Sequence, residues 1–210
     1  AHRPNIITVA WTGTVCTNPP MVYISVRPQR YSYDILDETG EFVINLTTKE
    51  LARATDYCGV RSGRDVDKFK ETGLTAVEAT KVKAPLIAEA PVNIECRITE
   101  KKELGSHHMF LAEVLAVHVD EKYLDENGKM CTNQEKLIDG AWYRFDANGY
   151  MITGWYGAND GSWYYYGSNG QAGNGFTQIG NVWYYLEYNG YMITSSWKQI
   201  GDVWYYLGTR

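Results

Sequence analysis

The chain shows two patterns of apolar and polar residues, and the first is the alternation typical of β-strands. Strands are expected at residues 6–11, 21–26, 42–46, 92–98 and 108–119, and short helices at residues 33–39 and 49–57. Pro19-Pro20 separates the first two strands. Several strands at short spacing with few helices predict a β-barrel with helical insertions.

The second pattern is a repeat of aromatic residues in the last third of the chain. The runs are Trp142-Tyr143, Trp163-Tyr164-Tyr165, Trp183-Tyr184-Tyr185 and Trp204-Tyr205-Tyr206, which start 21, 20 and 21 residues apart. Asn-Gly follows three of them, at 148–149, 169–170 and 189–190. Because Asn-Gly favours type I′ hairpin turns, we expect β-hairpin units of about 20 residues, stacked as a solenoid.

Composition changes where the repeats begin. Six of the seven tryptophans and 12 of the 17 tyrosines lie after residue 140, and charged residues become sparse there. The polar stretch around Asn127-Gly128 is typical of a domain boundary. We therefore expect two domains, residues 1–131 and 132–210.

Charge and composition exclude several classes of protein. The formal net charge is −5, which argues against a nucleic-acid partner. No window approaches 18 consecutive apolar residues, so no transmembrane helix is expected. The first residues lack the apolar run of a secretion signal. The four cysteines, at positions 16, 58, 96 and 131, have neither CxxC nor zinc-site spacing, so no metal site is predicted.

Two groups of residues carry candidate chemistry. Repeated tryptophans at hairpin junctions either form the solenoid core or make open aromatic cages that hold quaternary ammonium ions by cation–π attraction. In the first domain, Arg27, Arg30 and Ser32 follow a predicted strand and either grip a phosphate or form a solvated turn. His107 and His108 precede another strand and should point to opposite faces.

The repeats "GAWYRFDANGYMITGWY" and "NVWYYLEYNGYMITSSWKQIGDVWYY" resemble choline-binding, or cell-wall-binding, repeats over residues 137–210. The resemblance implies binding to choline on teichoic acids, or to a glucan as in related repeats. It also implies two candidate cages. The first uses Trp142, Trp155 and Trp163, and the second uses Trp183, Trp197 and Trp204, with Met192 nearby. Phe176 stands where the middle unit would carry the Gly-Trp aromatic.

The segments "PNIITVAWTGTVCTNPPMVYISVRPQRYSYDILDETGEFVINL", "DYCGVRSGRDVDKF" and "GSHHMFLAEVLAVHVD" resemble the flavoredoxin branch of the flavin reductase-like proteins over residues 4–129. The resemblance implies an FMN-binding split β-barrel, usually a homodimer. The residues implied around the isoalloxazine and ribityl chain are Ala10, Trp11, Thr12, Thr14 and Cys16. Those implied at the phosphate are Arg27, Arg30 and Ser32, and those bordering the flavin are Ser62, Arg64, Asp67, Lys68 and His107. Ser106 stands where many members have an aspartate before this histidine.

Family members normally begin about twenty residues earlier, with another strand, and continue past residue 129 with a closing segment, so the resemblance implies that the barrel of this chain is truncated at both ends. The two halves imply different locations, the cytoplasm for the flavin domain and the cell surface for the repeats. The expected function is an FMN oxidoreductase fused to a cell-wall-binding module. Its electrons would come from NAD(P)H or from an iron–sulfur partner. No acid–base pair is needed for electron transfer through a flavin, and none is predicted.

Two alternatives remain open. In one, the barrel is inert and only the repeats act, holding choline or a glucan. In the other, the chain is a purely structural chimera with neither activity. Whether the two halves form a natural fusion or an artificial joining of unrelated pieces is a separate question that the sequence leaves open.

Overall fold

The computed structural model describes residues 3–209, which form two compact units. The first reaches Asp120 and the second begins at Glu121. Both are mainly β, as the alternation of apolar residues predicts.

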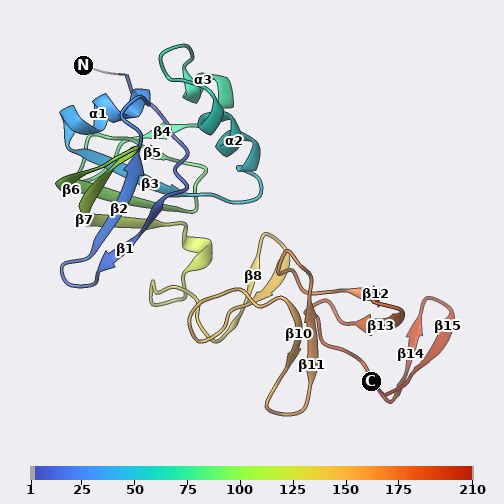
Figure 1. Cartoon of the computed structure of the whole chain (residues 1–210). Helices are drawn as coiled ribbons and strands as arrows, with labels where there is room; N and C mark the ends of the chain where they lie inside the picture. Colours follow the sequence, from blue (N-terminus) through green and yellow to red (C-terminus); the bar gives the residue numbers. More distant parts are fainter. Residues whose placement is uncertain (1–2, 210) are drawn as a thin grey trace. The chain divides into compact units, whose positions relative to one another are not determined.

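The first unit is built on a five-stranded antiparallel sheet (Figure 1). Its strand order is β1 (Thr12–Cys16), β2 (Met21–Val26), β7 (His107–Val119), β6 (Val92–Leu104) and β3 (Glu41–Leu46). The long β6–β7 hairpin forms the middle of this sheet, with β2 pairing to β7 and β3 pairing to β6. The order places the start of β7 beside the end of β2, where Val26 is opposite His108.

One face of this sheet supplies the core. Alternate residues of β2 are buried, and they pack with residues of β3, β6, β7 and α1 (Tyr31–Thr39). The buried core residues are Val22, Ile24, Val26, Leu36, Phe42, Cys96, Phe110 and Ala112. Each large aliphatic or aromatic side chain buried here contributes roughly 1.5–3 kcal/mol relative to exposure.

Short helices and a small second sheet complete the first unit. Helices α1 and α2 (Ala52–Val60) lie near the two predicted positions, and α1 ends at Gly40, whose positive φ of 68° suits a residue without a side chain. Helix α3 (Lys68–Thr72) was not expected, and Asp67 caps it by accepting from the Lys70 amide. The strands β4 (Ala76–Val77) and β5 (Leu86–Ile87) pair with each other.

The strand expected at residues 6–11 is absent, and this prediction was wrong. The first strand begins at Thr12, and the described residues before it form neither helix nor strand, although the Trp11 carbonyl accepts from the Ser25 amide of β2. The Ile6 carbonyl accepts from Lys68 Nζ, and the Thr8 hydroxyl donates to the Thr55 carbonyl. Contacts with the helical region, more than 45 residues away, therefore take the place of a strand ladder.

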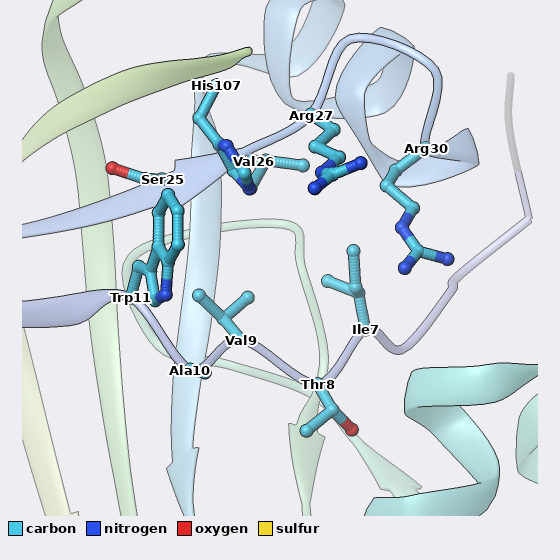
Figure 2. Close-up of a pocket in the computed structure, with 10 residues that line it drawn as sticks. All are labelled: Ile7, Thr8, Val9, Ala10, Trp11, Ser25, Val26, Arg27, Arg30 and His107. Carbon is cyan, nitrogen blue, oxygen red and sulfur yellow. The ribbon is translucent and has the colours of Figure 1, made fainter.

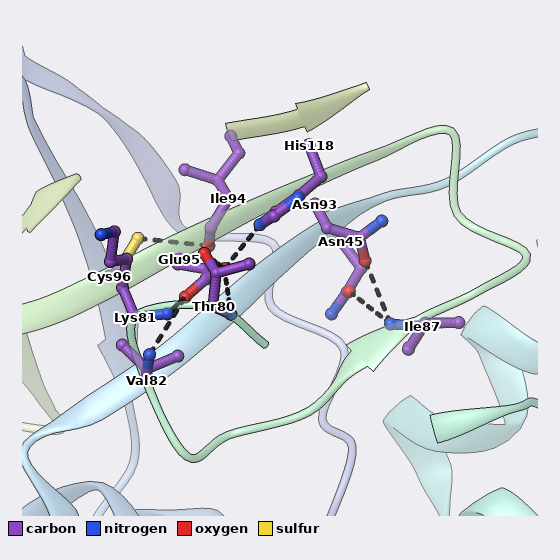
Figure 3. A network of polar contacts seen from close by, with 10 residues as sticks. All are labelled: Asn45, Thr80, Lys81, Val82, Ile87, Asn93, Ile94, Glu95, Cys96 and His118. Carbon is purple, nitrogen blue, oxygen red and sulfur yellow. Dashed lines mark hydrogen bonds and ion pairs between the residues drawn. The ribbon is translucent and has the colours of Figure 1, made fainter. Parts of the chain in front are cut away.

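A buried carboxylate fastens a loop to the sheet (Figure 3). The Glu95 side chain has no solvent exposure and accepts from the amides of Thr80, Lys81 and Val82 and from the Thr80 hydroxyl. His118 Nε2 lies 2.5 Å from Glu95 Oε1. Burial raises the pKa of Glu95, but the hydrogen bonds from Thr80, His118 and Lys81 outweigh it and lower the pKa to about 2.

The second unit starts with a short 3₁₀ helix, η1 (Glu121–Tyr123), and continues as four hairpins, each a separate two-stranded sheet (Figure 1). The hairpins are β8 (Glu135–Ile138) with β9 (Ala141–Arg144), β10 (Gly154–Gly157) with β11 (Trp163–Tyr166), β12 (Gly175–Ile179) with β13 (Val182–Leu186), and β14 (Ser196–Ile200) with β15 (Val203–Leu207). These are called hairpins 1 to 4.

The hairpin turns are not at the Asn-Gly pairs. Asp139-Gly140 closes hairpin 1 with positive φ at both residues, as a type I′ turn requires, and Gly180 and Gly201 begin the turns of hairpins 3 and 4. Each Asn-Gly turn instead follows the second strand, and only its glycine has positive φ. The expected type I′ geometry at Asn-Gly was therefore wrong, although these pairs do reverse the chain through the bridges Phe145–Met151, Tyr166–Ala172 and Leu186–Met192.

Neighbouring hairpins are joined through the backbone. The Met192 amide donates to the Trp163 carbonyl, the Tyr165 amide to the Gly190 carbonyl, and the Ala172 amide to the Trp142 carbonyl. Each of these bonds connects an aromatic strand to the turn that follows the next one. A hairpin this small cannot bury its own face, so its core comes from its neighbours.

Candidate functional site

A groove with two connected cavities lies in the first unit. Cavities of about 120 Å³ and 200 Å³ share the lining residues Ile7 and Arg30. The smaller is lined by residues 7–11, by residues 25–27 at the end of β2, by Arg30 and by His107 (Figure 2). The larger is lined by Asn5 and Ile7, by residues 29–32 at the start of α1, and by residues of α2, α3 and the loop between them.

The smaller cavity has an aromatic side and a cationic side. Figure 2 shows the Trp11 and His107 rings on one side and the guanidinium groups of Arg27 and Arg30 on the other. The Trp11 and His107 ring centroids are 4.0 Å apart, and the rings are tilted by 34°. Burial and the charge of Arg27 both lower the pKa of His107, which favours a neutral imidazole.

The two adjacent histidines point to opposite faces, as strand alternation predicts. His107 lines the cavity, and its Nδ1 lies 3.0 Å from the Ser106 hydroxyl. His108 Nδ1 lies 2.7 Å from the Tyr33 hydroxyl. His107 alone is therefore placed for contact with a ligand in the groove.

The larger cavity gathers positive charge. Its lining includes Arg30, Arg61, Arg64 and Lys68, with the hydroxyl residues Ser32 and Ser62. Of these cations, Arg64 has a carboxylate partner, with Nη2 3.5 Å from Asp34 Oδ2. Helix α1 begins at Tyr31 beside this cavity, and the positive end of its dipole adds to the attraction for an anion.

Lys68 is the most informative residue of this cavity. Its side chain is only 4% exposed, and Nζ donates to the carbonyls of Ile6 and Cys58. An ammonium group has three donors, so one is left for a ligand. Burial lowers the pKa of Lys68, and nearby Arg30 lowers it further, while Cys58 raises it. The buried cation is thus placed beside a second cation rather than a carboxylate.

Ser32 is held ready by a neighbour. Asn5 Nδ2 donates to the Ser32 hydroxyl oxygen over 2.8 Å, which leaves the hydroxyl hydrogen available for donation. The two residues come from segments 27 positions apart.

The structure brings most of the expected flavin residues to this groove. Those lining it are Ala10, Trp11, Arg27, Arg30, Ser32, Ser62, Arg64, Lys68 and His107. Thr12, Thr14 and Cys16 lie on β1 and are not among the lining residues; the Thr12 hydroxyl donates to the Tyr23 carbonyl, and Cys16 is exposed. Asp67 serves as the cap of α3.

Sequence reasoning missed several lining residues. Arg61 immediately precedes the Ser62-Gly63-Arg64 motif, and its charge was an available signal. Ile7 and Val9 carried no signal, because apolar residues in a predicted strand are assigned to the core. Asn5 gave none either, since its partner Ser32 is remote in the sequence.

The second unit contains a cluster of aromatic rings around Trp155. Its ring centroid lies 5.1 Å from that of Tyr165, 6.4 Å from that of Trp163 and 4.8 Å from that of Tyr184, all edge-on or nearly so. Tyr184 comes from hairpin 3 and the others from hairpin 2. The cluster therefore joins two consecutive hairpins.

A second cluster repeats this arrangement one hairpin later. Phe176 lies 5.3 Å from Tyr185 of its own hairpin and 5.0 Å from Tyr205 of the next one. Sequence reasoning missed the tyrosine from the following hairpin, although the spacing of about 20 residues between the runs points to it.

The other expected cage residues are placed differently. Trp142 contacts Tyr188, at 6.2 Å between ring centroids, and its indole nitrogen is buried with no hydrogen-bond partner among the described residues. Trp197 contacts Tyr206 at 5.4 Å. Trp183, Trp197 and Trp204 are 62%, 63% and 59% exposed, while Met192 is buried.

Comparison with known proteins divides the chain in a similar way. The family model described as flavin reductase like domain matches residues 1–134. The choline-binding repeat model matches residues 135–174, and a cell wall binding repeat model matches residues 174–192 and 195–209.

Individual relatives agree with the family match. An uncharacterized protein of Archaeoglobus fulgidus is 33% identical over 124 residues, covering 59% of this chain and 70% of that protein. Flavoredoxin of Desulfovibrio vulgaris (Miyazaki F) superposes with a TM-score of 0.59 at 30% identity, covering 74% of this chain and 82% of that one. Flavoredoxin from Methanosarcina acetivorans gives 0.57 at 27% identity, covering 74% and 81%. The expected split β-barrel fold followed by hairpin repeats is confirmed.

Proposed function

The chain belongs to the flavin reductase like family over residues 1–134 and carries choline-binding repeats after them, and on that premise we propose that it is an FMN-dependent oxidoreductase tethered to choline-bearing cell-wall polymer. The similarity to two solved flavoredoxins supports a flavin cofactor.

The buried ammonium of Lys68 carries the proposal for FMN. A buried charge is costly unless it is paired, and here Arg30 adds a second positive charge rather than compensating the first. A phosphate dianion in the larger cavity would supply the missing negative charge. Arg30, Ser32 and Lys68 would hold it, with a forked donor, a hydroxyl and an ammonium group.

The rest of the groove fits the other end of FMN. The smaller cavity continues from Arg30 towards Trp11 and His107, whose rings offer flat apolar surfaces to an isoalloxazine. Together the cavities are complementary to FMN, because the aromatic side of the smaller one suits the isoalloxazine and the cationic lining of the larger one suits the phosphate. Each is smaller than the roughly 300 Å³ of the smallest common ligand pockets, so a second copy of the chain is expected to cover the exposed side of the cofactor.

When bound, FMN supplies the redox chemistry, accepting electrons from NAD(P)H or an iron–sulfur partner and passing them to an acceptor. The chain's own residues bind and orient it. Arg27 and neutral His107 would set the charge beside the ring, and Trp11 would exclude water from one side.

The test compares FMN with riboflavin, which lacks the phosphate. Binding of each is measured by flavin fluorescence quenching for the wild type, Arg30→Ala and Lys68→Met, with exposed Arg53→Ala as the matched control. Loss of a charged hydrogen bond costs about 1.5–3 kcal/mol, so each variant should bind FMN about 10- to 100-fold more weakly and riboflavin nearly unchanged.

If these cations had only a structural role, replacing them would weaken the binding of FMN and of riboflavin equally. Equal loss of FMN and riboflavin binding in both variants therefore contradicts the phosphate assignment. A wild-type chain that binds neither flavin favours the second candidate, in which only the repeats act.

The aromatic clusters support the proposal for choline. A quaternary ammonium ion needs several ring faces and no hydrogen bond, and the Trp155 cluster offers rings from two hairpins. We expect the exposed rings of Trp183, Trp197 and Trp204 to contribute a further site, and a glucan stacked on these rings is the alternative ligand. Calorimetric titration with choline chloride and with a soluble glucan decides between them.

The proposed domain limits are residues 1–131 for the flavin domain and residues 132–210 for the binding module. Attachment to cell-wall polymer through the binding module favours a protein at the cell surface rather than in the cytoplasm. No helix among residues 3–209 is long and apolar enough to cross a membrane.

A further inference from the structure

The pairing register of the four hairpins identifies one position where hairpin 1 differs. Each second strand carries a tryptophan that recurs in all four hairpins. Two residues before the partner of this tryptophan, hairpins 2, 3 and 4 have the cross-strand aromatic pairs Trp155–Tyr165, Phe176–Tyr185 and Trp197–Tyr206. Hairpin 1 has Glu135 opposite Arg144 at this position. An ion pair therefore stands where the other hairpins present an aromatic pair.

Arg144 makes the kind of contact that a cationic ligand would make. Its guanidinium carbon lies 4.2 Å from the centroid of the Tyr156 ring, in hairpin 2. Nη1 lies 3.2 Å from Glu135 Oε1, and Nη2 donates to the Tyr156 hydroxyl over 2.9 Å. Burial lowers the pKa of Arg144, but Tyr156 and Glu135 outweigh burial and raise it, so the cation is permanent.

Glu135, like Arg144, is covered by residues of hairpin 2. The hydroxyl of Tyr166, a completely buried residue, donates to Glu135 Oε1 over 2.9 Å. Burial raises the pKa of Tyr164, and the charge of Glu135 raises it further. The side chains of Glu135 and Arg144 are only 24% and 19% exposed. The ion pair thus fills the space between hairpins 1 and 2.

We propose that Arg144 is an internal ligand that permanently occupies the first inter-hairpin position, so that quaternary ammonium binding begins at the Trp155 cluster. The proposal rests on the choline-type binding proposed above. It identifies Glu135 and Arg144 as the residues that exclude an external cation from this position. Hairpins 1 and 2 are then held together whether or not choline is present.

The test restores the aromatic pair. The triple variant Glu135→Trp, Arg144→Tyr, Tyr166→Leu copies hairpins 3 and 4, which have Leu186 and Leu207 at the position of Tyr166. Titration of the full chain with choline chloride should give one more bound choline per chain than the wild type. Exchanging the partners, Glu135→Arg with Arg144→Glu, is the control that keeps an ion pair and should give no additional site.

A second measurement needs no variant to fold and no choline to bind. The guanidinium NMR signal of Arg144 should show slow hydrogen exchange and should not shift with added choline or tetramethylammonium, whereas exposed Arg61 exchanges fast. Displacement of the Arg144 signal by either cation overturns the proposal.

The outcomes separate the two proposals. If the wild type binds choline and the triple variant gains no site, internal occupancy is wrong while choline binding stands. If the wild type binds no choline and Arg144 is slow to exchange, the proposed ligand is wrong while the internal contact stands.

Discussion

Replacing Glu95 with Gln should weaken the first unit more than any surface change. In the wild type, Glu95 Oε1 faces the Thr80 amide and hydroxyl and His118, while Oε2 faces the amides of Lys81 and Val82. A Gln side chain has one oxygen and one NH₂ group, so either orientation points NH₂ at two or more donors. Each buried donor without a partner costs about 1–3 kcal/mol, and we expect a loss of about 3–5 kcal/mol at pH 7.

The pH dependence of stability gives an independent value for the contribution of Glu95 to the free energy of unfolding. Lowering the pKa of Glu95 from its ordinary value of 4.5 to about 2 corresponds to about 3 kcal/mol of stability. Because the pKa is lower in the folded chain, this stability is present above about pH 4.5 and is lost as the pH falls towards 2. The Glu95→Gln variant should lack this part of the pH dependence.

Urea unfolding followed by hydrogen exchange of peptides from residues 78–120 measures the first unit without interference from the repeats. Glu100→Gln, an exposed carboxylate on the same strand, is the control and should change the unfolding free energy by less than about 0.5 kcal/mol. Equal stability of Glu95→Gln and wild type at pH 7, or the same slope between pH 5 and pH 2, would refute the reasoning.

Three further changes probe the groove and the repeats. Trp155→Ala should remove the choline site between hairpins 2 and 3 and leave FMN binding intact, as measured by calorimetry; unchanged stoichiometry would contradict the cluster's role, and exposed Tyr150→Ala is the control. Arg27→Gln should raise the pKa of His107, because it removes one of the two causes that lower it; an NMR titration of the imidazole that shows no change would exclude their coupling. Gly63→Ala would place a methyl group against Asn5 and Tyr31, so it should displace Asn5 from Ser32 and weaken FMN more than riboflavin, and similar binding of FMN by both proteins would count against this.

Local patterns predicted the elements whose hydrogen bonds are local or follow a regular ladder. Alternation located β2 and β3, and the aromatic period located the four hairpins. Alternation failed at residues 6–11, because the Ile6 carbonyl accepts a hydrogen bond from Lys68, 62 residues away, instead of pairing with a strand. The Asn-Gly pairs signalled chain reversal correctly, but their turn type depends on the bridge that follows each aromatic strand.

The site residues divide in the same way, into those that a local sequence motif indicates and those that depend on contacts between distant segments. The resemblance indicated Arg30, Ser32 and Lys68, and the structure adds that Lys68 is buried with the cation of Arg30 nearby. The roles of Glu135 and Tyr184 needed the register and the contacts between hairpins, which no single repeat encodes.

The sharing of aromatic clusters between hairpins determines how the binding module would respond to force. Tension applied along the chain passes mainly from each hairpin to the next, through contacts between successive hairpins, with one further contact between Trp142 of hairpin 1 and Tyr188, which follows hairpin 3. The contact of Phe176 with Tyr205 buries a smaller ring than the contact of Trp155 with Tyr184, so it should yield first. Hairpin 4 would then peel away under load while hairpins 1 and 2, joined by the Glu135–Arg144 ion pair, still hold.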